Sequence, residues 1–221
     1  TSGCLLTKPN TWKLVSNNGL HAYEELDSQL VSSDLDMKVD GILDEESWGN
    51  VQSADFKCST KAGTVIEFSA LSYMTGKGAY FGFDIKDKHV FYADESIRPI
   101  GLNSGMEILF APYGVSEITP ECLQLRITAN NIKKRYSGVI NASYPWSEDN
   151  FEMLSATTIH GELNTKNNTG YTIEMFIPWT SFGSNEQLDG VMICPSVIHV
   201  ENASQKDKSS PWDYCNVTKA N

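Results

Sequence analysis

A succession of short strand-like segments, each bounded by turn residues, is the feature that most constrains the fold of this chain. From residue 36 onward, runs rich in β-branched and aromatic residues alternate with clusters of Gly, Pro, Asn and Asp. Within 79–85, Phe81, Phe83 and Ile85 share one face. The pattern predicts strands at 38–39, 64–73, 79–85, 89–93, 106–112, 122–129, 134–140, 154–160, 171–178 and 191–200. So many short strands predict an all-β fold, an antiparallel sandwich of the jelly-roll or immunoglobulin-like type.

The N-terminal segment differs from the rest of the chain. Apolar residues near helical spacing predict a short amphipathic helix at 20–31, and they are Leu20, Tyr23, Leu26, Leu30 and Val31. We therefore expect 1–35 to form a partly helical N-terminal extension and 36–221 to form one sandwich domain.

The charge of the chain excludes several partners. Its 221 residues include 28 acidic and 17 basic side chains, which gives a formal net charge of −11. Nucleic acids and anionic membranes require basic surfaces, so neither is an expected partner. No apolar run approaches the ~20 residues of a membrane span, so direct membrane insertion is not expected either. An acidic surface suits a neutral ligand or a cation such as calcium.

Cysteines and glycosylation sequons indicate the compartment. Five cysteines allow two disulfide bonds with one thiol left over, and we expect Cys194 to pair with Cys215. Buried free thiols in a cytosolic protein are the alternative. Four sequons permit N-glycosylation, at Asn141, Asn167, Asn202 and Asn216. Together these features favour a secreted or cell-surface glycoprotein.

Signatures of catalysis are missing from the sequence. It has no GxSxG, HExxH, Walker or GxGxxG motif. Its four histidines are scattered and show no metal-ligand spacing. Any two of the 28 acidic residues could converge as a catalytic pair, but nothing marks a particular pair. We therefore expect a binding protein and not an enzyme.

Four motifs in a fixed order carry the strongest signal. They are Val39-Asp40-Gly41-Ile42-Leu43-Asp44-Glu45 followed by Trp48, Ala79-Tyr80-Phe81-Gly82-Phe83-Asp84-Ile85 followed by Asp87, Gly105-Met106-Glu107-Ile108-Leu109-Phe110, and Gly170-Tyr171-Thr172-Ile173-Glu174-Met175-Phe176-Ile177-Pro178-Trp179. As a set they resemble the family 9 carbohydrate-binding modules and the wider group of DOMON-like sandwiches. The resemblance covers about residues 37–215 and implies a β-sandwich that binds glycans without catalysis.

The resemblance also implies a sugar slot. In that family a sugar lies between two aromatic rings, and polar side chains bond to its hydroxyls. The matching positions here are Glu107, Arg126, Trp212 and His199, with Tyr92, Tyr113 or Trp146 as candidates for the second wall. The other slot Trp is absent, and 100–102 (Ile-Gly-Leu) takes its place. Two structural alternatives stay open: a Glu107–Arg126 ion pair on adjacent strands, and a core role for Trp212.

Further expectations follow from the same resemblance. Family members bind structural calcium, for which the candidate ligands are Asp40, Asp44, Asp84 and Asp87. The expected partner is a glycan or an extracellular protein, and the chain is expected to be part of a larger extracellular protein. An adhesion or protein-interaction domain that has lost the sugar slot is the alternative. Haem-binding relatives of the same sandwich suggest a further, minor alternative, a domain that binds haem b. Its candidate ligands are Met74, Met106, His160 and His199.

Overall fold

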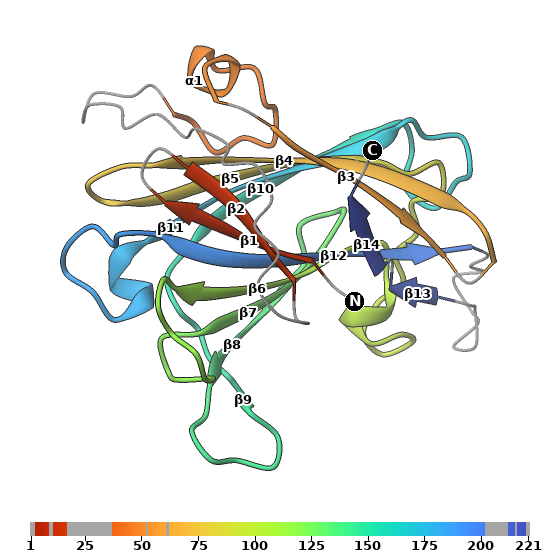
Figure 1. The fold of residues 1–221 in the computed structure, drawn as a ribbon. Helices are drawn as coiled ribbons and strands as arrows, with labels where there is room; N and C mark the ends of the chain where they lie inside the picture. The colour runs from red at the N-terminus through yellow and green to blue at the C-terminus, as the bar shows by residue number, and fades with distance from the viewer. Residues whose placement is uncertain are drawn as a thin grey trace.

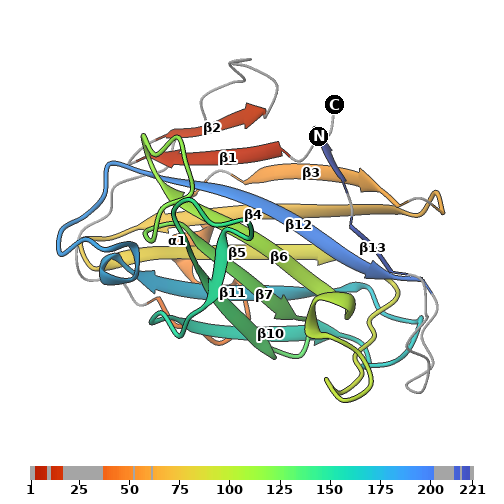
Figure 2. The ribbon, with the colours of Figure 1, turned by 90° about the horizontal axis from the view of Figure 1, so that it is seen from below.

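The structure, a computed structural model, describes residues 37–201 except Gln52 and Lys61, together with the backbone of four strands outside this range. Two antiparallel sheets face each other, with very little helix (Figure 1). In the view from below, the strands of one sheet cross in front of those of the other (Figure 2). The predicted all-β sandwich is confirmed.

Sheet A is eight-stranded, with the order β2-β1-β12-β6-β7-β8-β9 and β13 paired to β12. Its strands are β1 (Gly3–Lys8), β2 (Thr11–Ser16), β6 (Gly105–Pro112), β7 (Leu123–Thr128), β8 (Lys133–Gly138), β9 (Trp146–Glu148), β12 (Val191–Val200) and β13 (Trp212–Tyr214). Only the backbone is described for β1, β2 and β13.

Sheet B is six-stranded, with the order β10-β11-β5-β4-β3-β14. Its strands are β3 (Ala54–Ser59), β4 (Val65–Met74), β5 (Gly78–Lys86), β10 (Leu154–His160), β11 (Gly170–Pro178) and β14 (Asn216–Lys219). The helical turns are α1 (Glu46–Gly49), η1 (Ile100–Leu102) and η2 (Trp179–Phe182). No helix among the described residues is long and apolar enough to cross a membrane.

The core lies between the sheets, where alternate residues of each strand point inward. Phe81 and Phe83 of β5 meet residues of sheet A such as Ile108, Leu125 and Ile193, and all five are fully buried. Burying each of these side chains stabilises the fold by roughly 1.5–3 kcal/mol. The residues between them, at alternate positions, face away from the core and form the outer faces of the two sheets.

Two predicted strands are absent. Residues 38–39 have no strand pairing, and 89–93 contributes only an isolated bridge at Val90. Side chains take the place of a neighbouring strand there. The backbone N–H groups of Phe91, Tyr92 and Ala93 donate to side-chain oxygens instead, those of Ser104, Asn164 and Asn103. This loop therefore satisfies its backbone without joining a sheet.

The N-terminal part of the chain enters the sandwich. Strand β1 pairs with β12 and β2 pairs with β1, so the expected boundary at residue 35 does not separate these strands from the domain. The predicted helix at 20–31 lies outside the described residues.

Residues 37–51 cover the outer face of sheet B. Trp48 and Tyr73 are buried there and pack with Leu43 and Tyr80 in a second hydrophobic cluster. Glu174 on β11 is fully buried beneath this cover. Its carboxylate accepts hydrogen bonds from the backbone N–H groups of Asp40 and Gly41, both at 3.0 Å, and from Nε1 of Trp48 at 3.1 Å. Burial raises the pKa of Glu174, although the three N–H donors act in the opposite direction.

Candidate functional site

The outer face of sheet A carries a row of polar side chains. The strand register places Ser196, Glu107, Arg126 and Lys134 opposite one another across β12, β6, β7 and β8. In the next row, Tyr136 of β8 lies opposite Gln124 of β7. Side chains two residues apart on a strand share a face, so Tyr136 lies on the same face as Lys134.

Glu107 and Arg126 form the centre of this row. Nε of Arg126 donates to Oε2 of Glu107 at 2.6 Å, and both side chains are partly exposed. The guanidinium also lies over the ring of Tyr136, 5.4 Å from its centroid. A methyl group at Gly101 would lie only 3.2 Å from Cδ of Arg126, so the backbone of η1 packs closely on this side chain. The guanidinium is therefore held between an acid, an aromatic ring and a turn.

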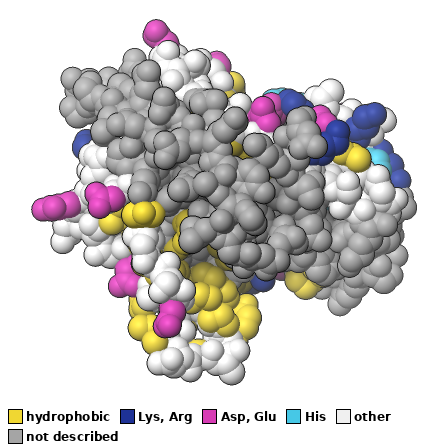
Figure 3. Space-filling view, viewed as in Figure 1, with side chains coloured by type: hydrophobic (Ala, Val, Ile, Leu, Met, Phe, Trp, Pro, Cys, Tyr) yellow, Lys and Arg dark blue, Asp and Glu magenta, His cyan; other side chains and the backbone are white. Residues whose placement is uncertain are grey.

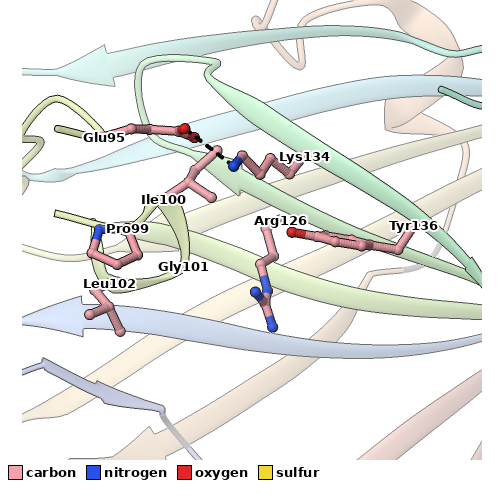
Figure 4. Close-up of a pocket in the computed structure, with 8 residues that line it drawn as sticks. All are labelled: Glu95, Pro99, Ile100, Gly101, Leu102, Arg126, Lys134 and Tyr136. Carbon is pink, nitrogen blue, oxygen red and sulfur yellow. Dashed lines mark ion pairs between the residues drawn. The ribbon is translucent and has the colours of Figure 1, made fainter. Parts of the chain in front are cut away.

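A cavity of about 470 Å³, with Arg126 in its lining, opens on this face (Figure 4). We call it the sheet A cavity, and its lining residues are Glu95, Pro99, Ile100, Gly101, Leu102, Arg126, Lys134 and Tyr136. In Figure 4, Arg126 and Tyr136 extend from neighbouring strands, with the Glu95–Lys134 ion pair on one side and Leu102 on the other. Nζ of Lys134 lies 3.2 Å from the Glu95 carboxylate. The cavity thus combines an aromatic ring, apolar atoms and charged hydrogen-bonding groups.

The structure brings some of the predicted binding residues together. Glu107 and Arg126 form the ion pair on adjacent strands that was the structural alternative to sugar contact, and both side chains stay partly exposed. Tyr92 lies in the neighbouring loop but does not line the sheet A cavity. Burial and the charges of Asp94 and Glu95 raise the pKa of its phenol. Trp212 lies opposite Val200 in the register of β13 with β12, and its side chain is outside the described residues.

His199 does not reach the sheet A cavity. It is almost fully buried, on the inward side of β12 with Val197, and its Nδ1 lies 2.9 Å from Oδ2 of Asp87. The expected sugar contact from this residue is therefore wrong. The alternation along β12 explains the placement, because odd-numbered positions from Val191 onward face the core.

Tyr136, Lys134 and Glu95 line the cavity but were not among the predicted site residues. The strand containing Tyr136 was predicted, and the period of two puts Tyr136 and Lys134 on one face. The missing signal is which strands are neighbours, because only the pairing of β7 with β8 brings Tyr136 beside Arg126. Residues 100–102, which replace the slot Trp in sequence, do line the cavity. Of the other candidate walls, Trp146 lines a different hollow and Tyr113 is exposed on a turn.

The four aspartates proposed for calcium do not converge. Asp40 pairs with Lys38 at 2.7 Å, Asp84 pairs with Lys86 at 2.5 Å, Asp87 binds His199, and Asp44 is exposed. Among the described residues, Asp40 instead lies near two other carboxylates, those of Glu45 and Glu174. The oxygens of Glu174 already accept three N–H bonds, so this group does not fit a calcium cage. Calcium binding stays a prediction without a defined site.

The cysteines and sequons are only partly described. Cys58 and Cys194 each take part in a disulfide bond, whereas Cys122 is a buried free thiol. Cys215 lies outside the described residues, so its pairing with Cys194 stays a prediction. Asn141 and Asn167 are exposed, which would allow glycosylation at both. The side chains of Asn202 and Asn216 are outside the described part of the chain.

The residues considered for haem ligation are buried in the core, exposed at the surface or bound to another side chain. Met74 and Met106 are fully buried in the hydrophobic core, and His160 is exposed at the end of β10. Nδ1 of His199 is bound to Asp87. These positions give the haem alternative no further support.

Comparison with known proteins supports the fold. No protein-family model matches the chain, and no curated protein has a matching sequence. A family 9 carbohydrate-binding module from Caldicellulosiruptor kristjanssonii in complex with cellotriose matches with a TM-score of 0.56 and 17% identity, over 85% of this chain and 83% of that one. A module of the same family and organism in complex with glucose matches with a TM-score of 0.54 and 16% identity, over 84% and 83%.

A protein from Bacteroides uniformis matches with a TM-score of 0.53 and 14% identity, over 76% of this chain and 78% of that one. At these identities the likeness shows the fold alone. The chain has the β-sandwich of the family 9 carbohydrate-binding modules. The wider likeness to DOMON sandwiches stays a prediction.

Proposed function

We propose that this chain is a non-catalytic glycan-binding module of a larger secreted or cell-surface protein, and that its ligand binds in the sheet A cavity. The observation that carries the proposal is the juxtaposition of Tyr136, Arg126 and Glu107 beside a cavity of about 470 Å³. Its volume falls within the roughly 300–1,000 Å³ that is common for small-molecule sites.

The chemistry of these side chains suits a sugar ring. A sugar presents an apolar C–H face, which packs on an aromatic ring such as Tyr136, and a rim of hydroxyls that need hydrogen-bond partners. Arg126 and Lys134 supply donors only, whereas Glu107 and Glu95 supply acceptors. A hydroxyl both donates and accepts, so it can bond to both kinds of group. The two carboxylates offset the charges of Arg126 and Lys134, so the site offers an anion such as phosphate no net positive charge.

The structural neighbours support the same assignment. The Caldicellulosiruptor kristjanssonii module is described in complex with cellotriose and with glucose, and it shares the sandwich of this chain. We further propose that Trp212, on the strand next to β12, contacts a more distant unit of an oligosaccharide ligand. Tyr136 would stack on the sugar in the cavity, and Ile100–Leu102 closes the side where the family slot has its other Trp. Strands β12, β6 and β7 lie between β13 and β8, so Trp212 does not face Tyr136 across one sugar ring.

The test is a glycan array with the wild-type chain, followed by calorimetric titration of the best glycan, with glucose and cellotriose as first probes. We expect Tyr136→Ala to weaken binding by about tenfold or more, because the sugar loses its stacking surface. Tyr144→Ala is the matched control, since Tyr144 is exposed and does not line the cavity. Absence of binding to every glycan, or equal binding by Tyr136→Ala and the wild type, would contradict the proposal.

A protein-binding domain is the second candidate. One observation favours it: hydrophobic side chains gather low on the face in Figure 3, where Figure 1 places β8 and β9. A smaller hollow of about 190 Å³ lies there, with Val115, Ile118, Trp146 and Met192 in its lining. If no glycan binds and substitution of Ile118 and Trp146 abolishes capture of an extracellular protein, the second candidate replaces the first.

A further inference from the structure

Two histidines and a glutamate meet at one end of the sandwich, away from the sheet A cavity. His89 follows β5 of sheet B, whereas His199 and Glu201 lie at the end of β12 in sheet A. Each residue offers a ligand atom, and these atoms all lie within 4.8 Å of one another. The two imidazole rings are stacked with centroids 5.3 Å apart. We call these three residues the histidine site.

Asp87 fixes the orientation of His199. Oδ2 of Asp87 lies 2.9 Å from Nδ1 of His199, and Oδ1 accepts the backbone N–H of His89 at 2.8 Å. A carboxylate can only accept, so Nδ1 of His199 carries the hydrogen. In the neutral ring the lone pair then lies on Nε2, which points toward Glu201. A buried carboxylate that holds the far side of an imidazole in this way is typical of metal-ligating histidines.

Two ring nitrogens of the site lie near Glu201 but form no hydrogen bond with good geometry in the described part of the chain. Nε2 of His199 and Nδ1 of His89 are both buried, and neither makes a hydrogen bond with the described residues. The side chain of His199 is only 1% exposed. Buried polar atoms without protein partners are costly and rare, and a bound ion can satisfy them. Two such atoms in one cluster indicate a shared ligand.

The spacing of the ligand atoms fits a small transition-metal ion. Nε2 of His199 lies 3.4 Å from Oε1 of Glu201, and Nδ1 of His89 lies 3.7 Å from Oε2. Ligands about 2.0–2.1 Å from a tetrahedral zinc ion lie about 3.3 Å apart. Calcium prefers oxygen ligands, so two imidazoles disfavour it.

We propose that His89, His199 and Glu201 form a zinc site that joins the two sheets. The two imidazoles and the carboxylate supply three ligands, and water takes the fourth position. Asp87 is a positioning residue in this site, and the Thr64 hydroxyl, which donates to Oε1 of Glu201, is another. The ion would link the segment after β5 to the end of β12, and so stabilise this end of the sandwich against separation of the sheets.

The protonated form of His199 competes with the proposed zinc-bound form. Burial lowers the pKa of His199, but its hydrogen bond to Asp87 and the charges of Asp87 and Glu201 outweigh this effect, so the pKa is raised. A protonated ring would donate from Nε2 to Glu201 and leave no lone pair for a metal. Zinc and a proton therefore exclude each other at this nitrogen.

The experiment is a titration of chelator-treated, dialysed protein with Zn²⁺ near pH 7.5, in competition with a chromophoric chelator. We expect one equivalent to bind, and a hundredfold excess of Zn²⁺ over Kd to raise Tm by about 5 °C or more. Ca²⁺ at the same concentration should not displace Zn²⁺ from the site. His89→Ala should weaken zinc binding by at least tenfold, and Asp87→Asn by about 10–100-fold.

His89 is partly exposed, so its substitution should preserve the fold, which circular dichroism would verify. His160→Ala, which removes an exposed histidine outside the site, should bind zinc as the wild type does. The proposal is overturned if the wild type binds no zinc at micromolar concentrations, or if His89→Ala binds as tightly as the wild type. Glycan binding involves other residues, so either result leaves the proposed function to its own test.

Discussion

Glu107 on β6 and Glu174 on β11 occupy comparable positions, since each faces outward from the middle of a strand. Glu174 is fully buried under residues 37–51 and accepts three N–H bonds from them. The Glu107 side chain is 20% exposed and shares its carboxylate with Arg126, beside an open cavity. The same side chain therefore anchors a cover on one sheet and forms part of an accessible site on the other.

This difference extends to the whole outer faces of the two sheets, one of which is covered while the other is accessible. The cover on sheet B turns its outer face into a second small core around Trp48 and Tyr73. The corresponding face of sheet A keeps a partly exposed acid, a guanidinium and an aromatic ring within contact of one another. Polar side chains that are held in place and remain accessible are what a ligand requires. We therefore propose that the outer face of sheet B contributes to stability and that the outer face of sheet A binds the ligand.

The largest predicted effect belongs to the covered face. Glu174→Ala removes the acceptor of three N–H groups and leaves them buried without partners, so we expect a loss of about 3–5 kcal/mol in the free energy of unfolding. Urea denaturation followed by tryptophan fluorescence would measure it. A loss below about 1 kcal/mol would show that residues 37–51 do not anchor to sheet B through this carboxylate.

A second prediction concerns the attachment of the cover at Gly41. Its φ is +87°, and a Cβ there would lie 2.8 Å from the backbone N and C of Thr157. Gly41→Ala should therefore cost about 2–3 kcal/mol. Gly63→Ala is the matched control, because Gly63 has the same φ but open space around it, so only the smaller backbone term of about 1 kcal/mol applies. Equal losses for both variants would mean that the close contact with β10 does not hold the cover.

On the open face, the predicted effect is on affinity. Arg126→Lys keeps the charge but loses the planar fork that bonds to Glu107 and stacks on Tyr136, so we expect glycan Kd to rise about tenfold. Arg135→Lys, on β8, is the control, because its guanidinium contacts Phe151 and Asn150 and does not line the cavity. Isothermal titration with the array-selected glycan would measure both, and a similar change in the two variants would argue against a specific role for Arg126.

The smallest predicted effect is that of Glu107→Ala on stability. Its ion pair with Arg126 is partly solvated, so we expect a loss of about 1 kcal/mol or less. The same urea denaturation would measure it beside Glu174→Ala. A loss as large as that of Glu174→Ala would mean that Glu107 is a structural residue and would remove the contrast between the two faces.

Much of the sandwich could be predicted, because a strand that buries alternate residues has apolar residues at alternate positions of its sequence. The segments 79–85 and 191–200 match β5 and β12 closely, since in both strands the odd-numbered residues face the core. Residues 89–93 have strand composition, but their backbone N–H groups donate to the side chains of Asn103, Ser104 and Asn164, which lie 10, 13 and 72 residues further along the chain. Such long-range partners leave no local pattern to read.

The site was less predictable than the fold. Glu107 and Arg126 were identified by resemblance to a known motif order, and the register of β6 with β7 brings them together. Tyr136 depends on the pairing of β7 with β8, which composition does not specify. His199 was expected at the sugar, although the alternation along β12 already placed it with the inward-facing residues. Its meeting with His89 joins two sheets, and sequence spacing does not reveal contacts of that kind.

A ¹⁵N-HSQC titration of the chain with the glycan selected by the array would test the division between the two outer faces most sharply. We expect backbone amide shifts to concentrate on β6, β7 and β8 around Glu107, Arg126 and Tyr136, while those of β11 and α1 stay unchanged. Shifts confined to the covered face of sheet B, or spread without preference over both sheets, would contradict the assignment of binding to the outer face of sheet A.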